Sequence, residues 1–165
     1  MRIKIFYYSY TGNTQKVSQQ LQEFLINRGC QANLERILCV DESSSFFKQG
    51  MRAFLKKSGQ IAPLDLADLQ GWDWIGLGFP VWAFSLPPGV RGFLEKLPPL
   101  PGKKVFIFVT FGSGAGKTKA LDEAEKLLNT KGYRTFYKMG IPSSKIEDKD
   151  WLDSQFEGLY QILAP

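Results

Sequence analysis

Histidine is absent from this 165-residue sequence, and cysteine occurs only twice, at Cys30 and Cys39. Without histidine the chain cannot carry Ser-His-Asp or Cys-His nucleophilic catalysis, which excludes hydrolases of those types. The sequence also lacks the clustered imidazole and thiolate ligands that zinc and other transition metals prefer. If the stretch between the two cysteines is an extended strand, they lie about 30 Å apart, beyond the reach of a disulfide.

Long apolar runs are missing as well. The longest, residues 105–109, is far shorter than the roughly 20 residues of a membrane-spanning helix. The apolar stretch at residues 5–8 is too short for a signal peptide. With 44% apolar and 14% aromatic residues, the chain can still form a packed core. We therefore expect one cytoplasmic domain over residues 1–165, with no membrane span.

Positive charge is concentrated in the first third of the chain. The net charge is +5, and residues 1–60 account for it with nine Lys and Arg against four Asp and Glu. A basic surface can attract acidic proteins or nucleic acid over long distances. No nucleic-acid-binding signature is present, so we expect no nucleic-acid partner. A solvated basic face without any partner is the alternative.

Hydrophobic periodicity predicts strands that alternate with helices. One apolar face recurs at Val17, Leu21, Phe24 and Leu25, and Gly29 follows as a helix stop. Further helices are predicted at residues 89–97, 118–131 and 150–163, and strands at 3–8, 32–40, 75–79, 104–111 and 135–139. Such alternation predicts an α/β fold with a parallel sheet covered on both faces. Ligands of these sheets bind beyond the carboxyl ends of the strands, so the loops after strands one, three and four are the places to look.

The loop after the first predicted strand is rich in hydrogen-bonding groups. Five of its six residues, 9–14, are polar, and the sixth is Gly12. Unpaired N–H groups and the dipole of the following helix favour an anion there, and a glycine lets the backbone approach it closely. A plain helix cap at Thr11 or Asn13 is the alternative. The number of polar groups exceeds what capping needs, which indicates a phosphate site.

Two further loops carry aromatic and small residues. After the third strand, Pro80 fixes the backbone before Trp82, whose ring could stack on a flat cofactor or pack as ordinary core. After the fourth, small residues at 112–116 allow close backbone approach. The following Lys117 is not part of a nucleoside-triphosphate loop, because the glycine required at position 111 is Phe111. Gly112 and Gly114 likewise lack the third glycine of a dinucleotide fingerprint.

These three loops together resemble the flavodoxin-like family of FMN-binding proteins. The phosphate-loop pattern of that family is matched by Ser9, Thr11, Gly12 and Thr14. The resemblance implies a three-layer sandwich with five parallel strands in the order 2-1-3-4-5, and FMN as cofactor. It also implies that Trp82, with Phe84 and Phe111 as second candidates, contacts the flavin. The cofactor-binding residues expected from all three loops are Ser9, Tyr10, Thr11, Gly12, Asn13, Thr14, Pro80, Val81, Trp82, Ala83, Phe84, Thr110, Phe111, Gly112, Ser113, Gly114 and Gly116.

The chain departs from that family in charge and in its third loop. Electron-shuttle flavodoxins are usually acidic, whereas this chain is basic. Their third loop usually carries an acid and a stacking tyrosine, where Ala115, Gly116 and Lys117 stand here. Charge near the flavin tunes its electronics, which leaves one- and two-electron chemistry both open.

An insertion at residues 41–63 separates the second and third strands. It carries an apolar stripe of Phe47, Met51, Phe54 and Leu55, which predicts a helix capped by residues 43–45. That helix would cover a sheet edge, close over the flavin or dock an acidic redox partner. The basic residues available for such docking are Lys48, Arg52, Lys56 and Lys57.

Three functions follow, none of which needs a catalytic side chain. The first is an FMN redox protein that passes electrons between partner proteins. The second is an NAD(P)H-dependent quinone or flavin reductase, in which hydride goes directly to the flavin. The third is a binding module of the same fold that has lost FMN, although the intact phosphate loop disfavours it.

Overall fold

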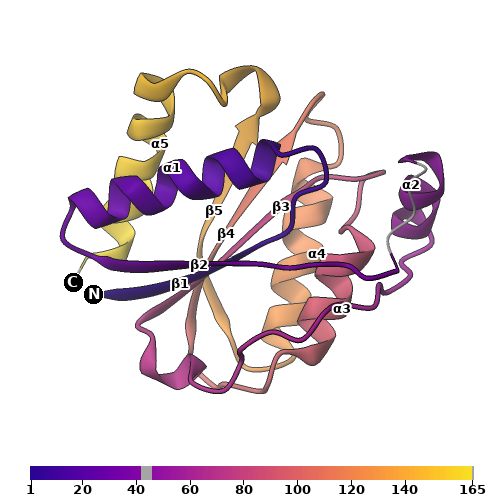
Figure 1. Ribbon diagram of the computed structural model, residues 1–165, viewed down its shortest axis with the longest axis horizontal. Helices are drawn as coiled ribbons and strands as arrows, with labels where there is room; N and C mark the ends of the chain where they lie inside the picture. Colours follow the sequence, from indigo (N-terminus) through magenta and orange to yellow (C-terminus); the bar gives the residue numbers. More distant parts are fainter. Residues whose placement is uncertain (42–45, 165) are drawn as a thin grey trace.

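A five-stranded parallel sheet forms the middle layer of the molecule, with helices on both faces (Figure 1). The computed structural model describes residues 1–41 and 46–164. The strand order is β2-β1-β3-β4-β5, which confirms the predicted fold class and order. The strands are β1 (Arg2–Tyr7), β2 (Gln31–Arg36), β3 (Trp74–Pro80), β4 (Lys104–Phe111) and β5 (Arg134–Pro142).

Burial distinguishes the three central strands from the two edge strands. In β1, β3 and β4 nearly every residue is buried, as continuous apolar runs in parallel sheets require. In β2 and β5 many residues are exposed or half-buried because each strand has only one neighbour. Strand position in the sheet therefore follows from the apolar content of each run.

Two pairs of helices cover the sheet. Helices α1 (Asn13–Asn27) and α5 (Lys149–Leu163) lie on one face, and α3 (Pro88–Lys96) and α4 (Lys117–Asn129) lie on the other (Figure 1). The short helices η1 (Leu69–Gly71) and η2 (Ser143–Lys145) lie in connections. Helix α1 ends before Gly29, whose φ of +79° is the left-handed stop predicted for it.

Helix α2 (Phe46–Phe54) lies beyond the carboxyl end of the sheet (Figure 1), where it contacts α3 and its Ala53 is buried in the core on that face. The predicted stripe is only weakly covered: Met51 is 45% exposed, Phe54 64% and Leu55, just after the helix, 55%. The residues expected to cap this helix, 43–45, lie outside the described part of the chain, as does the side chain of Phe47. Helix α2 thus does not cover a sheet edge.

Two strand boundaries differ from the prediction by more than one residue. Strand β2 ends at Arg36 rather than at residue 40, because residues 38–40 leave β1 and bond to the returning chain at residues 60–62. Strand β5 continues to Pro142 rather than residue 139, because residues 140–142 pair with the end of β4. Both ends are set by a neighbouring segment that is distant in sequence. Within the described residues, neither Cys30 nor Cys39 forms a disulfide.

Glycines in β3 make room for aromatic rings on β4. Gly76 lies opposite Phe106 in the sheet register, and Gly78 lies opposite Phe108. A Cβ at Gly78 would stand 2.2 Å from the Phe108 ring, well inside van der Waals contact. The two rings fill the layer beneath α1 and α5 and are fully buried. Close packing of this kind leaves no space for a larger residue in β3.

Candidate functional site

Three loops meet at the carboxyl edge of the sheet, as the sequence predicted. The hydroxyls of Thr14 and Thr110 lie 2.8 Å apart and share a buried hydrogen bond that joins the first loop to the end of β4. The rings of Tyr10 and Trp82 meet edge-on, with centroids 5.2 Å apart, and join the first loop to the second. At Gly116, a Cβ would lie only 2.5 Å from the Phe84 Cα, so the third loop packs on the second.

The loop at residues 9–14 leads into helix α1, whose N-terminus has no side-chain cap. Helix α1 has Gly12 as its N-cap, with φ of +93° and no side-chain cap hydrogen bond. Thr11 and Asn13 therefore do not serve as the simple N-cap that the sequence left open. No atom lies within 4 Å of the position that a Gly12 Cβ would take. The start of α1 therefore has no side-chain cap, and the positive end of the helix dipole favours an anion there.

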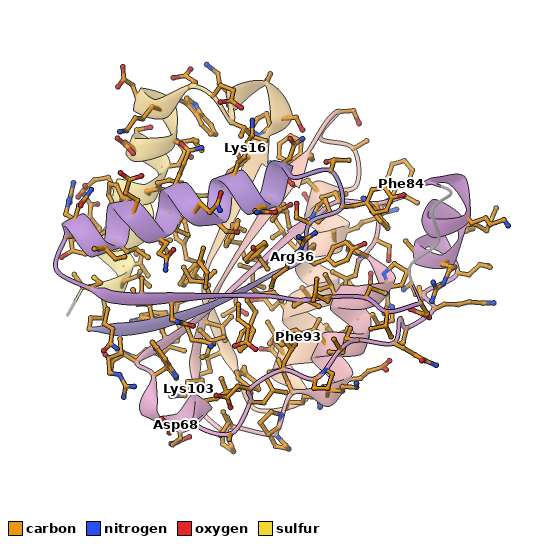
Figure 2. The ribbon with its side chains drawn as sticks, viewed as in Figure 1. Lys16, Arg36, Asp68, Phe84, Phe93 and Lys103 are labelled. Atoms are coloured by element: carbon orange, nitrogen blue, oxygen red, sulfur yellow. The ribbon has the colours of Figure 1, made fainter. Side chains whose placement is uncertain are left out.

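Ser9 is the residue that most clearly indicates a ligand. Its side chain is 3% exposed, and its Oγ has no hydrogen-bond partner in the described structure. A buried hydroxyl left without a partner costs roughly 1–3 kcal/mol, so such groups are rare. Arg36 at the end of β2 donates from Nη2 to the Ser9 carbonyl at 3.0 Å and brings a cation beside the loop (Figure 2). These residues fit the phosphate of FMN.

The second loop contains a strained two-residue turn. Trp82 and Ser85 exchange backbone hydrogen bonds of 3.2 and 2.7 Å. Between them, Ala83 and Phe84 have φ of +42° and +63°, in the left-handed region that non-glycine residues rarely adopt. Each such residue costs about 1–2 kcal/mol, and strain of this kind gathers at binding sites.

Trp82 and Phe84 lie in different environments on this turn. Trp82 is 6% exposed, because its ring packs edge-on against Tyr8 and Tyr10. Phe84 is 55% exposed and lies next to α2 (Figure 2). Trp82 therefore packs largely as core, the alternative that the sequence left open. Phe84 is therefore the aromatic ring of this turn that is exposed, beside α2.

An apolar cavity of about 550 Å³ separates the turn from α2. One wall comes from the helix and the other from the loop after β3. Its lining is almost wholly apolar, which suits the flat face of an aromatic ring system. The lining residues are Gly50, Met51, Phe54, Val81, Trp82, Ala83 and Phe84.

The third loop is more open. Gly112 and Ser113 are exposed, and the loop is tied to the β5–α5 connection by a 3.1 Å hydrogen bond from Ser143 Oγ to the Phe111 carbonyl. The Nζ atom of Lys117 lies over the Phe111 ring, 5.4 Å from its centroid. Lys117 also packs against Gly140 of β5. Its charge is therefore held on the β5 side of the loop.

Sequence reasoning missed a polar cluster beneath the second loop. Glu123 of α4 accepts hydrogen bonds from Ser85 Oγ at 2.7 Å and from Arg91 Nη2 at 2.9 Å. Burial raises the pKa of the Glu123 carboxyl, but the hydrogen bonds from Ser85 and Arg91 outweigh burial and hold its pKa below the ordinary value. The carboxyl is therefore charged at neutral pH. No spacing rule could have found this cluster, since its members come from three separate elements.

The basic segment around α2 is partly neutralised. Arg52 is paired with Asp41 at 2.5 Å, and Lys56 lies 3.4 Å from Glu123. Lys48 and Lys57 are exposed. The basic segment therefore presents exposed lysine side chains near the apolar cavity.

No helix in the described ranges has the length and apolarity of a membrane span. Among the same residues, His, Cys, Asp and Glu nowhere gather in threes as a metal site would need.

Comparisons with known proteins agree with the fold. A search of curated sequences gave no significant match. Among solved structures, a flavoprotein from Lactobacillus acidophilus in complex with FMN has a TM-score of 0.69 at 16% identity, covering 90% of this chain and 98% of that chain. A flavodoxin mutant from Pseudomonas aeruginosa has a TM-score of 0.69 at 15% identity, with all of both chains covered. Two-electron reduced flavodoxin from Megasphaera elsdenii has a TM-score of 0.61 at 21% identity, covering 94% and 98%.

The sequence pattern of one family matches most of the chain. That family is described as flavodoxin, and the match covers residues 5–156. This range contains all three loops and every predicted cofactor-binding residue. The chain therefore belongs to the flavodoxin family, whose members bind FMN.

Proposed function

We propose that this protein binds FMN non-covalently and carries electrons between partner proteins. The observation that supports this most directly is the buried Ser9 hydroxyl, which has no hydrogen-bond partner among the described residues and lies beside the uncapped start of α1. FMN, when bound, supplies reversible electron transfer, while the protein supplies binding, orientation and electrostatics.

In this proposal the first loop binds the phosphate of FMN, and the other two loops contact its ring. Ser9, Thr11 and the first N–H groups of α1 hold the phosphate. Thr14 keeps its hydroxyl on Thr110 and aligns the loops rather than holding the ligand. Phe84 and the backbone of residues 112–116 flank the ring. The exposure of Phe84 and the burial of Trp82 favour Phe84 as the ring-contacting aromatic.

An anaerobic reductive titration of FMN-reconstituted protein tests this function. We expect the flavin spectrum to survive desalting and to change in two separate stages as electrons are added. Absence of bound flavin would overturn the proposal and leave the binding-module function. Direct reduction by NAD(P)H with turnover on a quinone would instead support the reductase function.

Ser9→Ala should change stability and affinity in opposite directions. Removing the unpaired hydroxyl relieves a buried polar group, so the FMN-free protein should be unchanged or more stable, by up to about 1 kcal/mol. FMN binding should weaken about tenfold, the effect of losing one hydrogen bond to a charged group. Urea unfolding of the FMN-free protein and flavin-fluorescence titration measure the two quantities. Lower stability with unchanged affinity would show that Ser9 is only structural.

We further propose that an acidic redox partner docks on the basic segment around α2. Reversing Lys48 and Lys57 to Glu leaves the ion pairs of Arg52 and Lys56 in place. The electron transfer rate from an acidic reductase should then fall at least about tenfold at low ionic strength. At high salt the difference should vanish because counterions screen exposed charges.

A matched reversal at Lys126 and Arg134 controls for net charge. Both residues are exposed, and they lie near the end of α4 and the start of β5, away from α2. This control should leave the low-salt rate within about twofold of the unmodified protein, because its charges lie beyond a Debye length from the docking site. Equal slowing by both double variants would mean that only the total charge matters.

A further inference from the structure

The turn at residues 82–85 does not hold its conformation by local chemistry alone. Hairpin turns with two left-handed residues usually contain Asn, Asp or Gly, whereas this one contains Ala83 and Phe84. The two backbone hydrogen bonds between Trp82 and Ser85 close the turn but do not anchor it to the rest of the fold. Strained residues persist where the surroundings constrain them, so an external anchor is needed.

Ser85 supplies the attachment point of that anchor. It is the last residue of the turn and is 5% exposed. Its hydroxyl donates to Glu123 Oε2 at 2.7 Å and accepts from Arg91 Nη2 at 3.3 Å. The same Arg91 nitrogen donates to Glu123 Oε1 at 2.9 Å. The turn is thus held at its last residue by a carboxylate from α4 and a guanidinium from α3, while at its first residue the Trp82 ring packs against Tyr8 and Tyr10.

Arg91 depends on Glu123 for charge compensation. The Arg91 side chain is 9% exposed, and its Nε has no hydrogen-bond partner in the described structure. It also lies in the first turn of α3, where the helix dipole disfavours a cation and no acidic residue is present. Breaking a buried ion pair leaves an uncompensated charge, which is strongly unfavourable. The carboxylate of Glu123 is therefore needed for the guanidinium to remain beneath the turn.

Lys56 contributes less to this cluster. Its Nζ lies 3.4 Å from Glu123, but its side chain is 69% exposed, so solvent screens the pair. The buried contacts with Ser85 and Arg91 outweigh it. Glu123 therefore acts on the turn mainly through these two residues.

We propose that Glu123 is a positioning residue that holds the Trp82–Ser85 turn, and with it Phe84, in place against the flavin ring. The inference rests on the proposed function, because it needs this loop to contact the flavin. Glu123 acts through Ser85 and Arg91 and does not itself touch the cofactor. Loss of its charge should loosen the turn and weaken contacts to the ring, while the phosphate loop on α1 stays intact.

Glu123→Gln in the full chain tests this proposal. The variant preserves the shape of the side chain but removes the charge that Arg91 requires. In FMN-free protein, the Ser85 amide should exchange with deuterium at least about tenfold faster relative to the Ile107 amide in β4, since local opening becomes easier. Affinities for FMN and for riboflavin should fall by the same factor, about tenfold. Riboflavin has the same ring system but no phosphate, so equal losses mean that only contacts to the ring are weakened.

Glu125→Gln is the matched control. Glu125 lies on the same helix and pairs with Lys138 of β5 at 2.8 Å, away from the turn. We expect it to leave both the Ser85 exchange ratio and the two affinities unchanged. If Glu123→Gln fails to fold, Ser85→Ala tests the same anchor, since it removes the turn's attachment but keeps the Arg91–Glu123 pair. The same faster exchange at residue 85 and equal losses for both flavins would support the proposal.

The outcomes separate this inference from the proposed function. If the unmodified protein binds no FMN, both are overturned. If it binds FMN and the Glu123→Gln protein matches it in exchange ratio and affinities, only the positioning role is overturned. Loss of FMN affinity without loss of riboflavin affinity would also overturn it, because the effect would then lie at the phosphate.

Discussion

Gly12→Asp should weaken FMN binding at least about 100-fold while the protein remains folded. The new carboxylate would stand at the start of α1, in the open space that no other atom occupies within 4 Å. There it competes with the phosphate for the same N–H groups. It also repels the phosphate by about 4 kcal/mol at 4 Å and an effective dielectric constant of 20, which corresponds to several hundred-fold in affinity.

The expected stability change of this variant is small. A φ of +93° is unfavourable for any side chain, although Asp tolerates it better than most residues. Against this strain, a carboxylate at a helix N-terminus is stabilising by about 0.3–1 kcal/mol. Flavin-fluorescence titration and thermal unfolding of FMN-free protein measure affinity and stability separately.

Gly29→Asp is the control for charge and for backbone strain. Gly29 lies at the other end of α1, has a similar φ of +79° and also has open space around its missing Cβ. The same substitution there should lower stability by about 1–2 kcal/mol, since the helix dipole now opposes the charge. FMN affinity should be unaffected. Unchanged FMN binding by Gly12→Asp would place the phosphate elsewhere and contradict the assignment of this loop.

Gly78→Ala should destabilise the protein by about 3 kcal/mol, which lowers the melting temperature by roughly 6–12 °C in a domain of this size. The added methyl group would stand 2.2 Å from Phe108 Cζ, in the middle of the sheet. Phe108 is fully buried and stacks beside Phe106 at 6.5 Å, so its ring has no free space into which it can move. Either β3 and β4 separate or the ring leaves its preferred rotamer.

Gly50→Ala provides the matched comparison, because it adds the same methyl group where nothing lies within 4 Å. Gly50 is inside α2, where alanine is the better helix former, so stability should rise by about 0.5–1 kcal/mol. Urea unfolding of both variants and of the unmodified protein measures the change in the free energy of unfolding. A loss below about 1 kcal/mol for Gly78→Ala would mean that the core is less tightly packed than the structure indicates.

The sequence predicted the fold class, the strand order and a phosphate loop at residues 9–14, and the structure confirms the first two. Continuous apolar runs identify β1, β3 and β4 as central strands, because both of their faces are buried. The strand order came from resemblance as well as from pattern. A phosphate site at residues 9–14 could be predicted because a helix start rich in hydroxyls is a local feature, which a single stretch of sequence records.

Only the tertiary structure decided the features that depend on distant partners. The ends of β2 and β5 are set by segments that return to the sheet from elsewhere in the chain. The different exposure of Trp82 and Phe84 follows from two left-handed residues and from the Tyr8 and Tyr10 rings, none of which a hydrophobicity pattern records. The bond between Arg91 and Glu123 joins residues 32 positions apart. Charges so far apart become partners only when α3 and α4 pack on the same face of the sheet.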